Sequence, residues 1–173
     1  MRLAVLAFAA MLTLTGVAAA QTSPPFTINK EYRFAAIFPG APTFADITYT
    51  NSSGDRFPAR RFSVVQDNNI HAITVVDAAK GQDIDLNLVE HATEDLRKRG
   101  TVRTQEYEDY CPGVPGRQLE IMEPDGRQLR ASVYMWDHRL FITEAEGTPG
   151  SISLLQFEQS VTILNADGTS VNF

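Results

Sequence analysis

The chain has 173 residues, of which 43% are hydrophobic, 21% are charged and 9% are aromatic. This composition is typical of a globular protein, and it excludes the collagen-like, coiled-coil and disulfide-rich classes. Lys and Arg number 15 against 21 Asp and Glu, so the chain carries a net charge of −6 and lacks the basic surface that a nucleic-acid partner requires.

Residues 1–20 have the three parts of a secretory signal peptide. Arg2 precedes an apolar run from Leu3 to about Leu14, and small residues follow up to Ala20. The alternative is a transmembrane anchor, but two threonines and an Ala-rich end leave the run less apolar than a stable span requires. No cysteine stands at the cleavage site, which excludes a lipid anchor. We therefore expect a periplasmic or secreted protein that begins at Gln21 and has no stable membrane insertion.

The mature chain is predicted to be a single α+β domain over residues 27–164, between a polar lead-in at 21–26 and a polar tail at 165–173. No repeat, linker or low-complexity segment divides it. Apolar or Thr-rich runs bounded by turn residues predict β-strands. These strands cover residues 27–38, 43–50, 57–66, 70–77, 101–110, 116–123, 127–136, 139–146 and 161–164. The run at 70–77 is apolar at successive positions, so we expect a central strand that is covered on both faces.

One segment changes to a helical period. Apolar residues recur at three- and four-residue spacing from Ile84 to Leu96, which predicts an amphipathic helix with Asp85 as its cap and Gly100 as its stop. A second, shorter helix is predicted from the cap Ser151 to about Gln159. Its buried residues are expected to be Leu154, Leu155 and Phe157. The predicted fold is therefore an antiparallel β-sheet meander with helices packed on it.

Several turns and strand starts resemble those of one known group. They are Phe38-Pro39-Gly40-Ala41-Pro42, the run Gly113-Val114-Pro115-Gly116-Arg117-Gln118-Leu119, Arg130, Tyr134, Arg139-Leu140-Phe141 and Phe157-Glu158-Gln159-Ser160-Val161. In this order they resemble small secreted bacterial proteins of the PsbP-like fold group. The resemblance implies an α/β/α sandwich around an antiparallel sheet. It implies no catalytic residue, because the characterised members of the group work by binding other proteins.

Neither a metal site nor a cofactor site is expected. The three histidines, His71, His91 and His138, are far apart and have no metal-binding spacing. We expect His71 to be a half-buried, hydrogen-bonded residue of a strand. The spacing of Asp83, Asp85, Asn87 and Glu94 matches a calcium loop, but the turn position that requires Gly is Leu88.

No pattern of a catalytic nucleophile is present either. The chain has no G-x-S-x-G elbow and no phosphate-binding loop with its lysine. Its lone cysteine, Cys111, has no histidine near it in sequence, and we expect a small apolar residue at a strand end rather than a reactive thiol. We therefore predict that the protein is not an enzyme and has no catalytic residues.

One strand carries the strongest candidate for a binding site. Along residues 127–136, Arg130, Tyr134 and Trp136 share one face, and the opposite face is apolar. Arg, Tyr and Trp are the residue types enriched in binding hot spots. The alternative is that a helix or loop covers this face and the three side chains form a second core.

The functional expectation is an exported, non-enzymatic domain that binds an envelope protein. Two alternatives stay open at this point. A carrier of a small apolar or lipid ligand would need a cavity of several hundred cubic ångströms between sheet and helix. A hydrolase would need His71 or His138 in a cleft beside a carboxylate.

Overall fold

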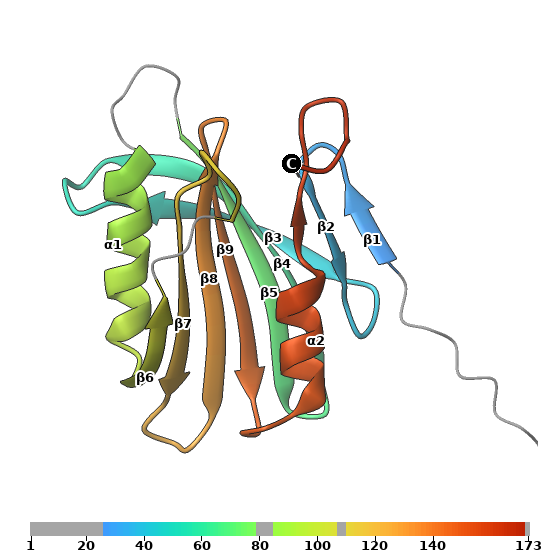
Figure 1. Ribbon diagram of the computed structural model, residues 1–173, viewed down its shortest axis with the longest axis vertical. Helices are drawn as coiled ribbons and strands as arrows, with labels where there is room; N and C mark the ends of the chain where they lie inside the picture. Colours follow the sequence, from blue (N-terminus) through green and yellow to red (C-terminus); the bar gives the residue numbers. More distant parts are fainter. Residues whose placement is uncertain (1–25, 79–84, 107–109, 172–173) are drawn as a thin grey trace, which may run out of the picture.

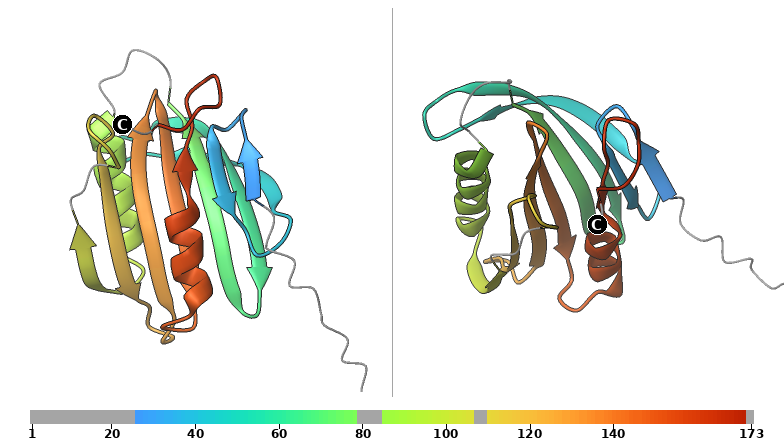
Figure 2. Two further views of the ribbon diagram at one scale, coloured as in Figure 1. Left: turned by 45° about the vertical axis from the view of Figure 1, so that its right-hand side comes forward. Right: turned by 45° about the horizontal axis from the view of Figure 1, so that its top comes forward.

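Strands dominate the fold, and two helices lie on opposite faces of the main sheet (Figures 1 and 2). The computed structural model describes residues 26–78, 85–106 and 110–171. Its strands are β1 (Phe26–Asn29), β2 (Phe34–Ile37), β3 (Thr43–Thr50), β4 (Arg56–Gln66), β5 (Asn69–Asp77), β6 (Thr101–Glu106), β7 (Gly116–Met122), β8 (Gln128–Trp136), β9 (Arg139–Gly147) and β10 (Thr162–Ile163). The helices are α1 (Asp85–Arg97) and α2 (Ile152–Ser160). The predicted α+β antiparallel architecture is confirmed.

The main sheet has seven strands in the order β3-β4-β5-β9-β8-β7-β6, and every neighbouring pair is antiparallel. Strands β5, β8 and β9 lie in the middle and are buried along almost their whole length. The prediction that residues 70–77 form a central strand is therefore confirmed. A strand that is covered on both faces has no side that faces water, so its sequence does not alternate between apolar and polar residues.

Two of the hairpins turn through residues with positive φ. In the turn before β5, Asp67 and Asn68 have φ of 51° and 62°, and in the turn before β9, Asp137 and His138 have φ of 43° and 61°. Two consecutive residues with positive φ form the turn whose twist matches that of a β-hairpin, and Asp and Asn tolerate this conformation. The second of these turns lies between the predicted strands 127–136 and 139–146.

Helix α1 covers one face of the sheet. Its stripe of Leu88, Val89, Ala92 and Leu96 is buried against the apolar faces of β7, β8 and β9, as the helical period predicts. Asp85 is the first helical residue rather than the cap. Gly100 lies beyond the end of α1, and a Cβ there would lie 2.2 Å from the carbonyl oxygen of Met122. The close approach of the chain to β7, and not the helix end, therefore requires glycine at this position.

The opposite face is covered by α2 and a small sheet of order β1-β2-β10. Leu154 and Phe157 of α2 are buried as predicted, but Leu155 is 39% exposed because it lies on the outer side of the helix. Ser151 is the N-cap by position, although its side chain makes no capping hydrogen bond.

The two ends of the domain differ from the prediction. Residues 27–38 were expected to form one strand, but they form the hairpin β1–β2, which reverses at Arg33 with a φ of 56°. The segment from Asn165 was expected to be a polar tail. Through residue 171 it folds back instead, because Val171 donates a backbone hydrogen bond to Ile163 and is buried in the core. Residues 1–25 and 172–173 lie outside the described part, and so does the predicted signal peptide.

Within the described residues, neither helix has the length and apolarity needed to cross a membrane.

Candidate functional site

The structure separates the two faces of β8 as the alternation of its residues predicts. Leu129, Ala131, Val133 and Met135 are buried on the side of α1, whereas Arg130, Tyr134 and Trp136 face the side of α2. Tyr134 is 6% exposed and belongs to the second core, and Trp136 is half-buried against that core. The second-core interpretation thus holds for Tyr134, while Arg130 lies at an open part of the same face.

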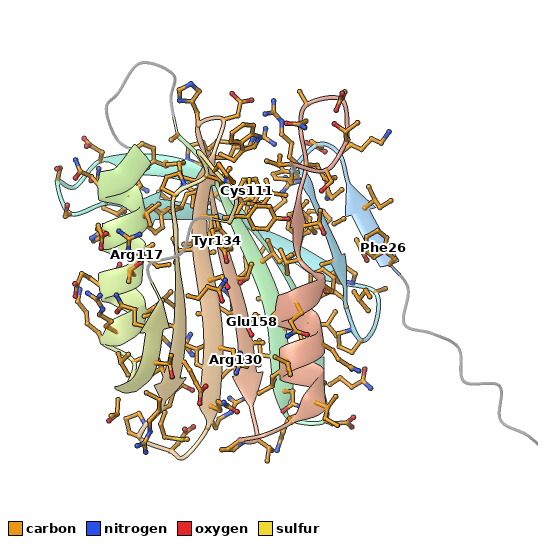
Figure 3. All side chains as sticks on the ribbon, viewed as in Figure 1. Phe26, Cys111, Arg117, Arg130, Tyr134 and Glu158 are labelled. Carbon is orange, nitrogen blue, oxygen red and sulfur yellow. The ribbon has the colours of Figure 1, made fainter. Side chains whose placement is uncertain are left out.

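A pocket of about 300 Å³ opens beside Arg130, between β8 and α2. Figure 3 shows Arg130, Tyr134 and Glu158 on this side of the sheet, with Glu158 projecting from α2. The pocket is lined by Tyr110, Gln118, Arg130, Ser132, Tyr134, Thr143, Glu158, Gln159 and Val161. Eight of these nine side chains carry a hydrogen-bonding group, so the pocket is polar.

Arg130 is held between two carboxylates. Its Nε donates a hydrogen bond to Oε2 of Glu158 at 2.5 Å, and its Nη1 lies 3.4 Å from Oε2 of Glu120 on β7. The Glu158 side chain is only 11% exposed, whereas those of Arg130 and Glu120 are 26% and 33% exposed. The pair with Glu158 therefore sits in a partly desolvated wall, where a charged hydrogen bond is stronger than at the open surface.

Two tyrosines and a glutamine of the lining contact one another. The Nε2 of Gln118 donates a hydrogen bond to the Tyr134 hydroxyl at 2.7 Å. The Tyr110 ring meets the Tyr134 ring edge to face, with 5.2 Å between the ring centroids. Burial raises the pKa of Tyr110, although hydrogen bonds with Ile163 and Thr162 oppose the rise. These contacts hold both rings in place.

Only part of this site was visible in the sequence. The alternation along β8 placed Arg130 and Tyr134 together, but Trp136 does not line the pocket. Sequence reasoning missed Gln118, Glu158 and Tyr110. The alternation along β7 brings Gln118 and Glu120 to the same face, because Gln118 pairs with Ser132 and Glu120 with Arg130. No local pattern reveals Glu158, since its place depends on how α2 packs.

None of the three histidines is among the described residues that line the pocket. His71 is 1% exposed and meets Phe157 edge to face at 5.2 Å, so the expectation of a half-buried residue is wrong. Neither ring nitrogen has a hydrogen-bond partner of ordinary geometry. Burial lowers the pKa of His71, and the nearby Ser153 backbone opposes this only in part. His91 lies on α1 with its Nε2 3.1 Å from the Thr50 carbonyl oxygen, and His138 lies in a turn.

No group of three metal-ligating side chains comes together among the residues that the structure describes. Asp83 of the calcium-like spacing lies outside the described residues, and Asn87 and Glu94 lie on α1. Cys111 sits at a bridge with Val114, half-buried against the second core, with its Sγ 3.9 Å from the Val171 carbonyl oxygen.

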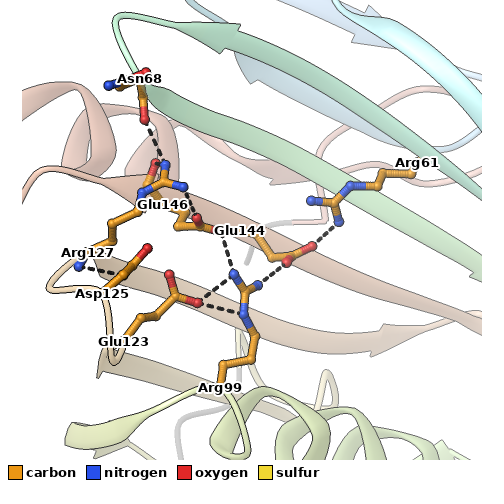
Figure 4. Close-up of polar contacts among 8 residues, drawn as sticks. All are labelled: Arg61, Asn68, Arg99, Glu123, Asp125, Arg127, Glu144 and Glu146. Carbon is orange, nitrogen blue, oxygen red and sulfur yellow. Dashed lines mark hydrogen bonds and ion pairs between the residues drawn. The ribbon is translucent and has the colours of Figure 1, made fainter.

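The densest group of charges lies on the other face, at the end of α1 (Figure 4). We call it the arginine–glutamate cluster, and its members are Arg61, Arg99, Arg127, Glu123, Glu144 and Glu146. Arg99 is central: its Nε donates to Glu123 at 2.8 Å, its Nη1 donates to Glu144 at 2.7 Å, and its Nη2 pairs with Glu146. Burial raises the pKa of Glu123, and Arg99 opposes the rise. With three charges of each sign joined by ion pairs, this cluster is internally compensated.

Compared with known proteins, the chain matches no family model and no curated protein sequence.

Proposed function

We propose that this protein is an exported, non-enzymatic accessory domain that binds another component of the cell envelope. In this proposal it is a PsbP-like domain, with the polar pocket beside Arg130 as its contact site. The order of the turn and strand motifs supports the family, and so does an antiparallel sheet with one helix on each face. The first twenty residues support export.

The observation that carries the proposal is an open, polar pocket that lacks an activated group. Its charged pair, Arg130 and Glu158, is internally compensated, and its remaining polar groups are hydroxyls and amides. General acid–base or nucleophilic chemistry most often uses a histidine, a cysteine or a carboxylate whose pKa is perturbed. The described lining residues include no histidine or cysteine. Such a surface is suited to recognition by hydrogen bonds.

The two alternative functions receive less support. A carrier of a lipid needs a cavity walled by apolar side chains, whereas Val161 is the one aliphatic residue among those described in this lining. A hydrolase needs its histidine beside a carboxylate in a cleft. His71 is instead enclosed by α2 and packs against Phe157.

The proposal is tested by crosslinking the mature protein in its own envelope and identifying what it captures. The first measurement is the intact mass of the exported protein, which should correspond to a start at Gln21. Capture should fall about tenfold in Arg130→Met, because truncating an anchoring Arg commonly costs over 1 kcal/mol of binding. Lys98→Met, an exposed substitution on the opposite face, is the matched control and should capture normally. Thermal unfolding of each variant shows whether the fold is intact. Equal capture by a folded Arg130→Met would refute the pocket as the contact site.

A further inference from the structure

The hydrogen-bonding groups of the pocket define the chemistry of what it can hold, and this inference rests on the proposed function. Donors and acceptors both line the pocket and the hollow next to it. Arg130 is a donor, Glu158 and Glu120 are acceptors, and the Gln118 amide and the Ser132 hydroxyl can be both. A well-matched ligand is therefore a small molecule that donates and accepts hydrogen bonds at many positions.

The charge balance argues against an anion. Among the described lining residues Arg130 is the one cation, and Glu158 and Glu120 already engage two of its nitrogens. A phosphate or carboxylate would have to compete with both for Arg130, and it would meet their repulsion at close range. A zwitterion such as an amino acid would have to separate the Arg130–Glu158 pair in order to be held by its two charges. A neutral ligand can leave the Arg130–Glu158 pair intact and form hydrogen bonds with the atoms of the pair that face the pocket.

The polar lining argues equally against an apolar ligand, because such a ligand would remove water from the charged, hydroxyl and amide groups without replacing its hydrogen bonds. A neutral molecule with many hydroxyl groups fits this lining. The rings of Tyr110 and Tyr134 add flat apolar surface beside these polar groups. Carbon–hydrogen faces and hydroxyl edges occur together in a sugar ring.

The pocket also continues into a second hollow. A space of about 160 Å³ lies next to it toward β6, lined by Thr104, Gln118, Leu119, Glu120, Arg130 and Glu158. Three of these residues, Gln118, Arg130 and Glu158, line both spaces. The two hollows therefore adjoin at these three residues and extend from α2 toward β6, and we call them together the polar groove.

From these observations we infer that the groove binds a neutral saccharide, with one sugar ring in the pocket beside Arg130 and a linked ring toward β6. A free sugar and an envelope polysaccharide would present the same chemistry. A linked saccharide fills both hollows, so it binds more tightly than a single sugar.

The first test is a titration of the mature protein followed by ¹H–¹⁵N NMR. The probes are glucose, N-acetylglucosamine, cellobiose and chitobiose, with inorganic phosphate, glycine and laurate as comparators. Saturable shifts of the Ser132 and Gln118 amides with a sugar are expected, and the disaccharide should bind about fivefold more tightly than its monosaccharide. Cosedimentation with insoluble cellulose or chitin distinguishes a polysaccharide source from a free sugar.

Two glutamines of α2 provide matched variants. Gln159 and Gln156 are both exposed, but only Gln159 lines the pocket. Gln159→Leu should weaken sugar binding about fivefold, the value of one net hydrogen bond, and Gln156→Leu should leave it unchanged. The inference is overturned if no sugar shifts the pocket amides, if phosphate, glycine or laurate shifts them instead, or if the two variants behave alike. In each of these cases the proposed function still stands if envelope capture depends on Arg130, and it fails with the inference if capture does not.

Discussion

Removing the central cation of the arginine–glutamate cluster should destabilise the fold substantially. In Arg99→Met, Glu123 loses its cation, and Glu144 and Glu146 keep one arginine each. The glutamate side chains are 10% to 11% exposed and that of Arg99 is 30% exposed. Breaking a fully buried pair costs about 3–5 kcal/mol and breaking an exposed pair costs at most about 1 kcal/mol. The intermediate burial of this cluster places the expected loss at about 2.5 kcal/mol.

Urea unfolding measures this loss, and the neighbouring lysine provides the control. Lys98 is 71% exposed and pairs with Asp95 at 2.7 Å, so Lys98→Met should cost less than about 1 kcal/mol. Adding Glu123→Gln to Arg99→Met should restore about 1 kcal/mol or more, because it removes the charge that lost its partner.

The pH dependence gives a second check with a defined sign. The pKa of Glu123 is raised by burial, and without Arg99 it rises further. A carboxyl whose pKa is higher in the folded state than in the unfolded state adds stability below the unfolded pKa and loses it as the pH rises through the folded value. The deficit of Arg99→Met should therefore be smaller near the ordinary glutamate pKa of 4.5 than at neutral pH. A deficit equal to that of Lys98→Met, unchanged by pH and by Glu123→Gln, would refute this account of the cluster.

Three further predictions concern the two cores. The pKa of His71 is lowered by burial, so stability should fall as the pH drops below about 6.5, with a slope of at most about 1.4 kcal/mol per pH unit. In His71→Phe the urea midpoint should change less with pH over this range. Leu96→Asp should cost about 4 kcal/mol in urea unfolding, because Leu96 is 6% exposed under α1, and a neutral effect would contradict the packing of that helix. Trp136→Ala should cost about 3 kcal/mol and lower the melting temperature, since Trp136 packs against the second core. A stable Trp136→Ala that loses envelope capture would instead make it a binding residue.

The elements that the sequence predicts are those whose buried residues follow a regular pattern. The stripe from Leu88 to Leu96 and the apolar run at 70–77 predict the helix and the central strand, because side chains along each must meet a core. The hairpin β1–β2 leaves no such trace. Its turn at Lys30–Arg33 contains no glycine or proline, and Arg33 adopts a positive φ without a local signal. Burial of Val171 is similarly invisible, since it depends on backbone pairing with Ile163 across a turn.

The candidate site likewise has one part that the sequence predicts and one part that depends on tertiary packing. Alternation along β8 predicts that Arg130 and Tyr134 share a face, because it is a property of the strand alone. Whether that face is open depends on how far α2 reaches across it. Tyr134 lies under the covering layer at 6% exposure, and Arg130 lies near its edge. The packing of α2 also explains why Glu158 lines the pocket and Trp136, which the sequence predicted as a site residue, does not.

The pocket follows from the unequal reach of the two helices. Helix α1 has 13 residues and packs on β7, β8 and β9, whereas α2 has nine residues and, within the described part of the chain, packs on β2, β5, β8 and β9. The face of β7 on the side of α2 is therefore not covered by that helix. Its side chains there are Gln118 and Glu120, in contrast to Leu119 and Ile121 on the covered side. Polar residues on the uncovered face avoid exposing an apolar patch, and together with Arg130 and Glu158 they line a groove that a ligand can enter while α2 stays packed.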